Sequence, residues 1–99
     1  MNIYTLQNPK PDFESFTTLY QNKNIKIEAI RSHLLQPGET YNQEQDEWVV
    51  LIRGNAQLKV AEKIIQFSEG DSLFLPRHTV HQVLSTSQDA LWLGVFIDT

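Results

Sequence analysis

Cysteine is absent from the 99-residue sequence, which excludes disulfide bonds and thiolate metal sites. Glycine is scarce: the four glycines stand singly at expected turns, so no glycine-rich phosphate loop is present. A nucleophilic triad would have to use a serine or threonine beside a histidine, and no nucleophile-elbow motif is found. These absences remove several common enzyme classes from consideration.

Positive charge is in the minority, with 8 lysines and arginines against 12 aspartates and glutamates. A net charge of -4 argues against nucleic-acid binding, which usually needs a basic surface. No apolar run is long enough to cross a membrane, and the first residues lack the features of a signal peptide. We therefore expect a single cytoplasmic domain spanning residues 1–99, with a small polar molecule as partner rather than a nucleic acid or a membrane.

The amino-terminal part of the chain favours a short strand followed by a helix. Residues 2–6 resemble a short strand that ends at a proline-containing loop. Asp12 can cap a helix over residues 12–20, because Phe13, Phe16 and Leu19 with Tyr20 would form one apolar stripe on it.

Beyond residue 25 the apolar residues follow a period of two, which is typical of strands. Turn residues separate the alternating segments. The strands expected from this pattern cover residues 25–29, 48–53, 56–60, 64–67, 72–75, 80–85 and 90–97. Short strands at this spacing predict an all-β antiparallel barrel or jelly roll.

Two motifs in this strand region resemble those of the cupin superfamily. In the first, Gly38, Glu47 and Gly54 match, and the six residues WVVLIR separate Glu47 from Gly54. In the second, Gly70, DSLFL and Pro76 lead to His81. The segments YNQEQDEWVVLIRGNAQL and FSEGDSLFLPRHTVHQV are similar to those of small single-domain bacterial cupins. The resemblance implies a double-stranded β-helix (jelly-roll) barrel with one short N-terminal helix.

The resemblance also implies a metal site built from Glu47 and His81. The His-x-His pair of the first motif is missing, and either Thr40 with Asn42 or Tyr41 with Gln43 stands in its place. A second imidazole could come from His78 or His33, and the ion would be divalent Zn, Fe, Mn or Ni. His78 also stands where a left-handed backbone is expected, which histidine tolerates better than most residues.

Other candidate residues would line a pocket in the barrel and bind substrate. They are Tyr41, Gln43, Phe74 and Trp92. We expect Glu47 and His81 to be neighbours inside the barrel, because a buried carboxylate needs a cationic or metal partner.

Three functions remain open at this point. The first, which is the favoured one, is a metal-associated cupin of unknown substrate, such as a metal-dependent oxygenase or isomerase that acts on a small polar molecule. The second is a metal-free cupin in which His81 acts as a general base, and the third is a non-catalytic module that binds a small ligand. A homodimer is expected, because residues 48–52 and 91–97 are too apolar for strands with one face in water.

Overall fold

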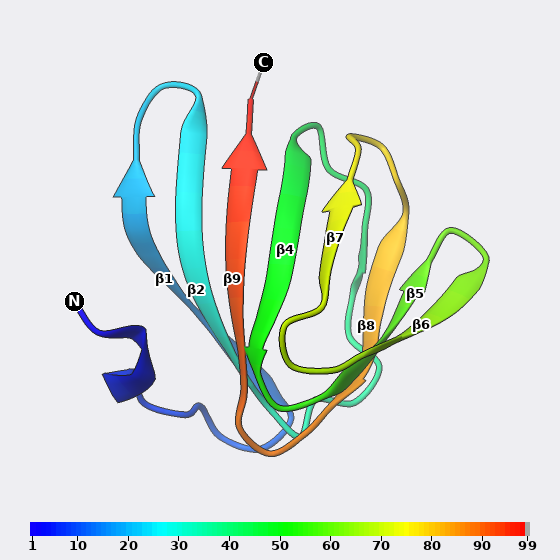
Figure 1. Ribbon diagram of the computed structural model, residues 1–99. Coiled ribbons are helices and arrows are strands. Elements are labelled where there is room, and N and C mark those ends of the chain that lie inside the picture. Colours follow the sequence, from blue (N-terminus) through cyan, green and yellow to red (C-terminus); the bar gives the residue numbers. More distant parts are fainter. Residues whose placement is uncertain (99) are drawn as a thin grey trace.

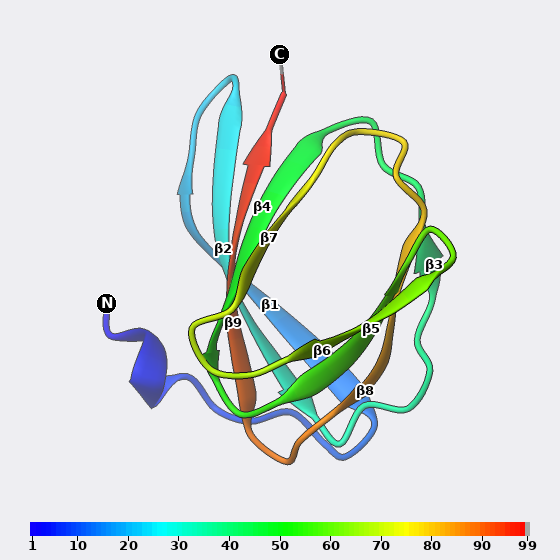
Figure 2. The same ribbon diagram turned by 45° about the vertical axis from the view of Figure 1, so that its right-hand side comes forward.

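The computed structural model describes residues 1–98, which form two antiparallel sheets facing one another (Figures 1 and 2). One 3-10 turn, η1 (Ile3–Thr5), precedes nine strands in this part of the chain. The strands are β1 (Phe13–Gln21), β2 (Ile25–His33), β3 (Thr40–Tyr41), β4 (Asp46–Arg53), β5 (Ala56–Val60), β6 (Lys63–Phe67), β7 (Ser72–Leu75), β8 (His81–Thr86) and β9 (Ala90–Ile97). The predicted all-β jelly-roll barrel is therefore confirmed, without the predicted helix.

Strands distant in sequence are neighbours in both sheets. The first sheet has the order β1-β2-β9-β4-β7, and the second has the order β3-β8-β5-β6. Figure 1 shows β9, the last strand, in the middle of the first sheet between β2 and β4. Consecutive strands β4 and β5 lie in different sheets, so each sheet contributes one wall of the barrel.

The core lies between the inner faces of the two sheets. Alternation along each strand sends every second side chain inward. In the first sheet these include Leu51, which is fully buried, and Trp92 opposite it on β9. Leu58 and Phe67 fill the space from the second sheet, and the Phe67 and Trp92 rings lie 5.7 Å apart.

The amino-terminal segment covers part of the outer face of the first sheet (Figure 1). The buried Arg31 donates a hydrogen bond from Nη1 to the carbonyl oxygen of Leu6 at 2.7 Å. The Arg53 guanidinium lies 4.9 Å from the centre of the Tyr4 ring. No helix in residues 1–98 has the length and apolar character required to cross a membrane.

The helix predicted over residues 12–20 is wrong, since this segment forms β1 and pairs with β2. Its apolar spacing fitted a helix by coincidence, whereas its phenylalanines, threonines and tyrosine have high strand propensity. Asp12 does not cap a helix: its Oδ1 accepts a hydrogen bond from the Gln36 backbone, and its φ is 69°. Pairing with β2 over the whole segment outweighed the local pattern.

The strand predicted over residues 2–6 is also wrong, because Ile3–Thr5 is a 3-10 turn capped by the Asn2 side chain. His33 ends β2 on the outer face, where its Nδ1 lies 2.7 Å from the Pro9 carbonyl oxygen. It therefore does not point into the barrel. The even-numbered residues of β2 face inward, and Ile30 lines the interior.

We expect two glycine substitutions to separate backbone strain from steric conflict. Gly54 and Gly70 both have positive φ, at +92° and +88°, but a Cβ would meet Ser87 and Ala90 only at Gly54. Gly70→Ala should lower the unfolding free energy by about 1–2 kcal/mol, the cost of left-handed backbone for an L-residue. Gly54→Ala should cost about 1–3 kcal/mol more because it also overpacks the β4–β5 turn. Urea titration measures both values, and equal losses would contradict the steric argument.

Candidate functional site

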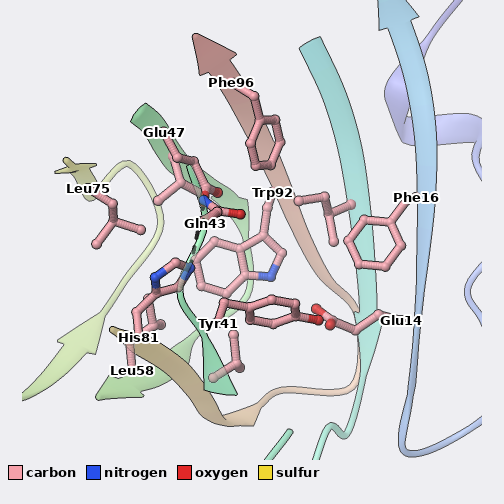
Figure 3. Close-up of a pocket in the computed structure, with 13 residues that line it drawn as sticks. Glu14, Phe16, Tyr41, Gln43, Glu47, Leu58, Leu75, His81, Trp92 and Phe96 are labelled. Atoms are coloured by element: carbon pink, nitrogen blue, oxygen red, sulfur yellow. Dashed lines mark hydrogen bonds and ion pairs between the residues drawn. The ribbon is translucent and has the colours of Figure 1, made fainter. Parts of the chain in front are cut away.

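A cavity of about 120 Å³ lies between the two sheets and is lined mainly by apolar and aromatic side chains. Both sheets and the β3–β4 segment contribute to it (Figure 3). The lining residues are Glu14, Phe16, Ile30, Tyr41, Gln43, Glu47, Val49, Leu58, Leu75, His81, Val83, Trp92 and Phe96. The few polar groups in this apolar setting are therefore the candidates for ligand binding or chemistry.

Two buried titratable side chains meet at one end of the cavity. Glu47 on β4 is 7% exposed and His81 on β8 is 8% exposed. His81 Nε2 lies 3.7 Å from Glu47 Oε1, which confirms the predicted neighbourhood of these residues. Gln43 Nε2 donates a hydrogen bond to the same Glu47 oxygen at 2.7 Å.

The orientation of the His81 ring is set by its other nitrogen. Nδ1 lies 2.9 Å from the Thr79 carbonyl oxygen. A carbonyl can only accept a hydrogen bond, so Nδ1 carries a proton. In the neutral ring, Nε2 then presents a lone pair toward Glu47 and the cavity. The Tyr41 ring stacks on the imidazole, with centroids 5.7 Å apart and an interplanar angle of 27°.

A second carboxyl group marks the opposite end of the cavity. Glu14 on β1 accepts a hydrogen bond at Oε2 from the Ser32 hydroxyl at 3.0 Å. Figure 3 shows the Tyr41 hydroxyl pointing toward Glu14, with Phe16 close by. Tyr41 therefore spans the cavity, with its ring against His81 and its hydroxyl toward Glu14.

Burial changes the acidity of the groups in the cavity. Desolvation raises the pKa of Glu47, against the opposing effects of the Gln43 hydrogen bond and of His81, and Glu28 and Glu14 raise it further. Desolvation also raises the pKa of Glu14, while the Ser32 hydrogen bond opposes this. The pKa of Tyr41 is raised by burial and then by the nearby carboxylates. All three groups hold their protons more tightly than they would in water.

The donor atoms at the site do not fit a firmly held divalent metal. Glu47 and His81 supply one carboxylate and one imidazole, whereas such sites usually take three or more protein ligands. Gln43 directs its amide NH₂ to Glu47, and Tyr41 directs its hydroxyl toward Glu14. Within residues 1–98, no group of three histidine, aspartate or glutamate side chains is placed to hold an ion.

The alternatives left open at the missing His-x-His pair are resolved by the position of β3. Tyr41 and Gln43 both line the cavity, as does Trp92, while Thr40 and Asn42 do not. Tyr41 pairs with His81 across β3 and β8, which places its side chain on the same inner face.

Phe74 and His78 lie away from the cavity, contrary to the roles suggested for them. Leu75 faces inward on β7, so its neighbour Phe74 faces outward, where it pairs with Trp48 and is 50% exposed. His78 is exposed at the turn before β8, and its ring contacts Asn42 at 3.3 Å. Its φ of 64° confirms the expected left-handed backbone.

Sequence reasoning missed the contributions of β1 and the end of β9. Glu14 and Phe16 were assigned to a helix, and Phe96 was noted only as part of an apolar strand. The signal for the first pair was their spacing of two residues, which places both on one face of a strand. Reading residues 13–21 with a period of two would have brought Glu14 into the site.

Fold and site together define a small cupin barrel with a cavity between its sheets. The sequence model of the cupin domain family matches residues 32–96 of this chain, so the chain belongs to the cupin family. No curated protein matches the sequence.

Solved structures agree with this assignment. A provisionally assigned mannose-6-phosphate isomerase from Ralstonia eutropha JMP134 is 30% identical, with a TM-score of 0.88 over 100% of this chain and 97% of that one. A cupin superfamily protein from Desulfitobacterium hafniense DCB-2 superposes with a TM-score of 0.86 at 13% identity, over 98% and 87% of the two chains. KdgF from Halomonas sp. superposes with a TM-score of 0.84 at 15% identity, over 100% of this chain and 91% of that one. The last two show the shared fold.

We expect Glu47→Gln to become progressively more stable than the natural protein as pH rises. The pKa of Glu47 is raised in the folded state from its ordinary value of 4.5, so at a pH above 4.5 the protein takes up protons when it folds. The natural protein therefore loses stability as pH rises from that value through the folded-state pKa, whereas the neutral amide does not titrate. Urea titrations from roughly pH 4 to pH 8 measure the difference.

The matched control is Glu62→Gln, which removes the same charge from an exposed turn outside the cavity. Its stability should follow that of the natural protein at every pH. A difference between Glu47→Gln and the natural protein that does not change with pH would contradict the burial argument.

Proposed function

We propose that this protein is a metal-independent cupin that binds a small molecule in the barrel and transfers protons on it, as an isomerase does. The observation that carries the proposal is the pair formed by His81 and Glu47. Both side chains are buried, both line the cavity, and their closest atoms are 3.7 Å apart. A buried acid and base on one side of a cavity suit proton transfer between neighbouring atoms of a bound molecule.

The two side chains have complementary roles in this reaction. His81 presents the lone pair of Nε2, so it removes a proton from a carbon beside a carbonyl group. The electron pair of that C–H bond moves into a new C=C bond, and the carbonyl oxygen takes a proton from the Glu47 carboxyl. The raised pKa of Glu47 favours the protonated form that this step needs. His81 then returns its proton to the former carbonyl carbon as the C=C bond breaks, and the hydroxyl group on the other carbon becomes the new carbonyl group by giving its proton to Glu47. Both side chains are thereby restored to their starting states.

The cavity favours small substrates without phosphate. Its volume is about 120 Å³, and its lining includes two glutamates but no lysine or arginine. Phosphate recognition usually relies on cationic side chains or on backbone amides at a helix terminus. The isomerase class suggested by the Ralstonia relative is therefore adopted in the proposal, whereas its phosphorylated substrate is not.

We expect the protein to exchange carbon-bound hydrogen of short, unphosphorylated aldoses and ketoses with solvent. Proton NMR in D₂O, beginning with glyceraldehyde and dihydroxyacetone, measures this exchange. His81→Gln and Glu47→Gln should each reduce the rate by about 100-fold or more, the usual contribution of a positioned general acid or base. Glu62→Gln serves as the control and should retain the natural rate.

Elemental analysis of untagged protein should accompany this assay. Active protein should contain substoichiometric metal, and a chelator should leave the exchange rate unchanged. One transition-metal ion per chain that is lost together with activity would overturn the metal-independent mechanism. Binding of these compounds without any exchange would reduce the protein to a ligand-binding module.

We also propose that the protein forms a homodimer through the outer face of the first sheet. A row of apolar side chains crosses all five strands of this face. It runs through the register pairs Tyr20–Ile27, Ile27–Val95, Val95–Trp48 and Trp48–Phe74. Tyr20, Trp48 and Phe74 are 54%, 37% and 50% exposed, so this surface suits a second copy of the chain.

Replacement of Trp48 by glutamate should convert the dimer to a monomer, because it places a charge in the middle of the apolar row. Ile64→Glu is the matched control, since Ile64 is 61% exposed on β6 in the other sheet. Sedimentation velocity distinguishes the two states. A natural protein that sediments as a monomer at high micromolar concentration would refute the dimer.

A further inference from the structure

Acidic side chains outnumber basic ones among the residues that line the cavity. Two carboxyl groups, from Glu14 and Glu47, face it from opposite ends, and His81 is the one basic side chain of the lining. Burial is the main cause of the raised pKa of Glu47, and repulsion by Glu14 adds a smaller contribution. Carboxyl groups that repel one another across an apolar space would be stabilised by a cation between them.

The cation on the inner face of the neighbouring strand is already engaged. Lys26 on β2 forms an ion pair with the buried Glu28 at 2.8 Å. Its ammonium also lies 5.7 Å from the centre of the Phe96 ring, outside the set of residues that line the cavity. Lys26 therefore neutralises Glu28 and leaves Glu14 and Glu47 without a lysine or arginine partner among residues 1–98.

Glu14 retains an unused hydrogen-bond acceptor. Ser32 occupies Oε2, and within the described residues 1–98 the other carboxylate oxygen accepts no hydrogen bond. At the far end, the His81 side chain is largely buried, and its Nε2 lies 3.7 Å from Glu47 Oε1, beyond hydrogen-bonding distance. Both ends of the cavity therefore present an acceptor atom with free capacity, on the half-buried Glu14 and on His81, that a ligand could satisfy.

Aromatic rings flank the space between these acceptors: Trp92 is buried, whereas Phe16 and Tyr41 are 54% and 36% exposed. Figure 3 shows Phe16, Trp92 and Tyr41 around the Glu14 carboxyl end, with the Tyr41 hydroxyl directed toward Glu14. Aromatic faces attract ammonium groups at exposed sites as well as at buried ones. Rings together with a carboxylate form the usual recognition site for an organic cation.

We propose that the cavity binds a small organic cation, a protonated primary amine, with its ammonium group at Glu14 among these rings. The rest of the molecule reaches toward Glu47 and His81. This inference rests on the proposed function for the reaction at Glu47 and His81. The substrate class is then a short amino-carbonyl compound, whose carbonyl group lies at this acid–base pair. A carboxylate or phosphate ligand would instead face the repulsion of the Glu14 carboxylate.

Binding of three ligands of similar shape tests the charge preference without requiring catalysis. The probes are benzylamine, benzyl alcohol and benzoate, which are cationic, neutral and anionic near neutral pH. We expect benzylamine to bind most tightly and benzoate not to bind. Glu14→Gln should weaken benzylamine binding by about tenfold or more, the size of one charge-assisted interaction. The amide can still accept the Ser32 hydrogen bond, so the variant should fold, and circular dichroism checks this.

Glu62→Gln is the control and should bind benzylamine as the natural protein does. Titrations followed by NMR chemical shifts measure all the affinities. Benzylamine binding that is unaffected by Glu14→Gln, or equal affinity for the three probes, would overturn the cation site.

Exchange kinetics then separate this inference from the proposed function. Aminoacetone and hydroxyacetone differ in the amine that replaces a hydroxyl group. We expect the natural protein to prefer aminoacetone in kcat/KM, Glu14→Gln to lose that preference, and His81→Gln to exchange neither compound. Equal exchange of both compounds by the natural protein would overturn the amine site and keep the isomerase. Benzylamine binding that depends on Glu14, with neither compound exchanged, would support the amine site and refute the isomerase.

Discussion

The carboxyl group of Glu47 has two polar neighbours in the barrel, the Gln43 amide and the His81 imidazole. Desolvation raises the pKa of the carboxyl, and the two neighbours offset only part of this effect. The arrangement therefore costs stability at neutral pH, because the ionised carboxylate is poorly solvated. A residue that is unfavourable for the fold and faces a cavity is typical of a functional position.

The rest of the site can be understood as the means of holding this pair in place. Glu47 comes from the first sheet and His81 from the second, so their distance depends on how the two sheets pack. The turn before β8 adds a direct tie, since the His78 backbone amide donates to the Gln43 carbonyl oxygen at 2.8 Å. The left-handed backbone of His78 thus helps to position Gln43, although the His78 ring lies outside the cavity.

Tyr41 connects the two ends of the cavity in a way that a histidine could not. Its ring stacks on His81, while its hydroxyl extends toward Glu14 (Figure 3). Together with Gln43 it stands where the first cupin motif carries its pair of histidines. The replacement exchanges two imidazoles for an aromatic surface and an amide hydrogen bond. This exchange supports the proposal of acid–base chemistry on a small cation in place of metal chemistry.

Local sequence pattern was sufficient for most of the strands, and the resemblance to the cupin motifs identified the central pair of the site. Residues 56–60, 72–75 and 90–97 form strands with the predicted bounds, since their alternation and flanking turns leave little choice. Glu47 and His81 were recognised because the segments around them resemble the two cupin motifs, and they lie on strands of different sheets. Phe74 was assigned to the cavity on its size alone, although the inward position of Leu75 requires it to face outward.

What only the tertiary structure decided was the other half of the cavity. The apolar residues of 13–21 satisfy both a helical period and a strand period, and local sequence cannot choose between them. Hydrogen bonding to β2 along the sheet edge selected the strand, which turned Glu14 and Phe16 into the barrel. The choice between Thr40 with Asn42 and Tyr41 with Gln43 was likewise made by the pairing of β3 with β8. The sequence by itself determined the barrel, which follows from local alternation, and its acid–base pair, which the resemblance to the cupin motifs implies. The carboxyl opposite that pair depends on long-range strand pairing, which no local pattern specifies.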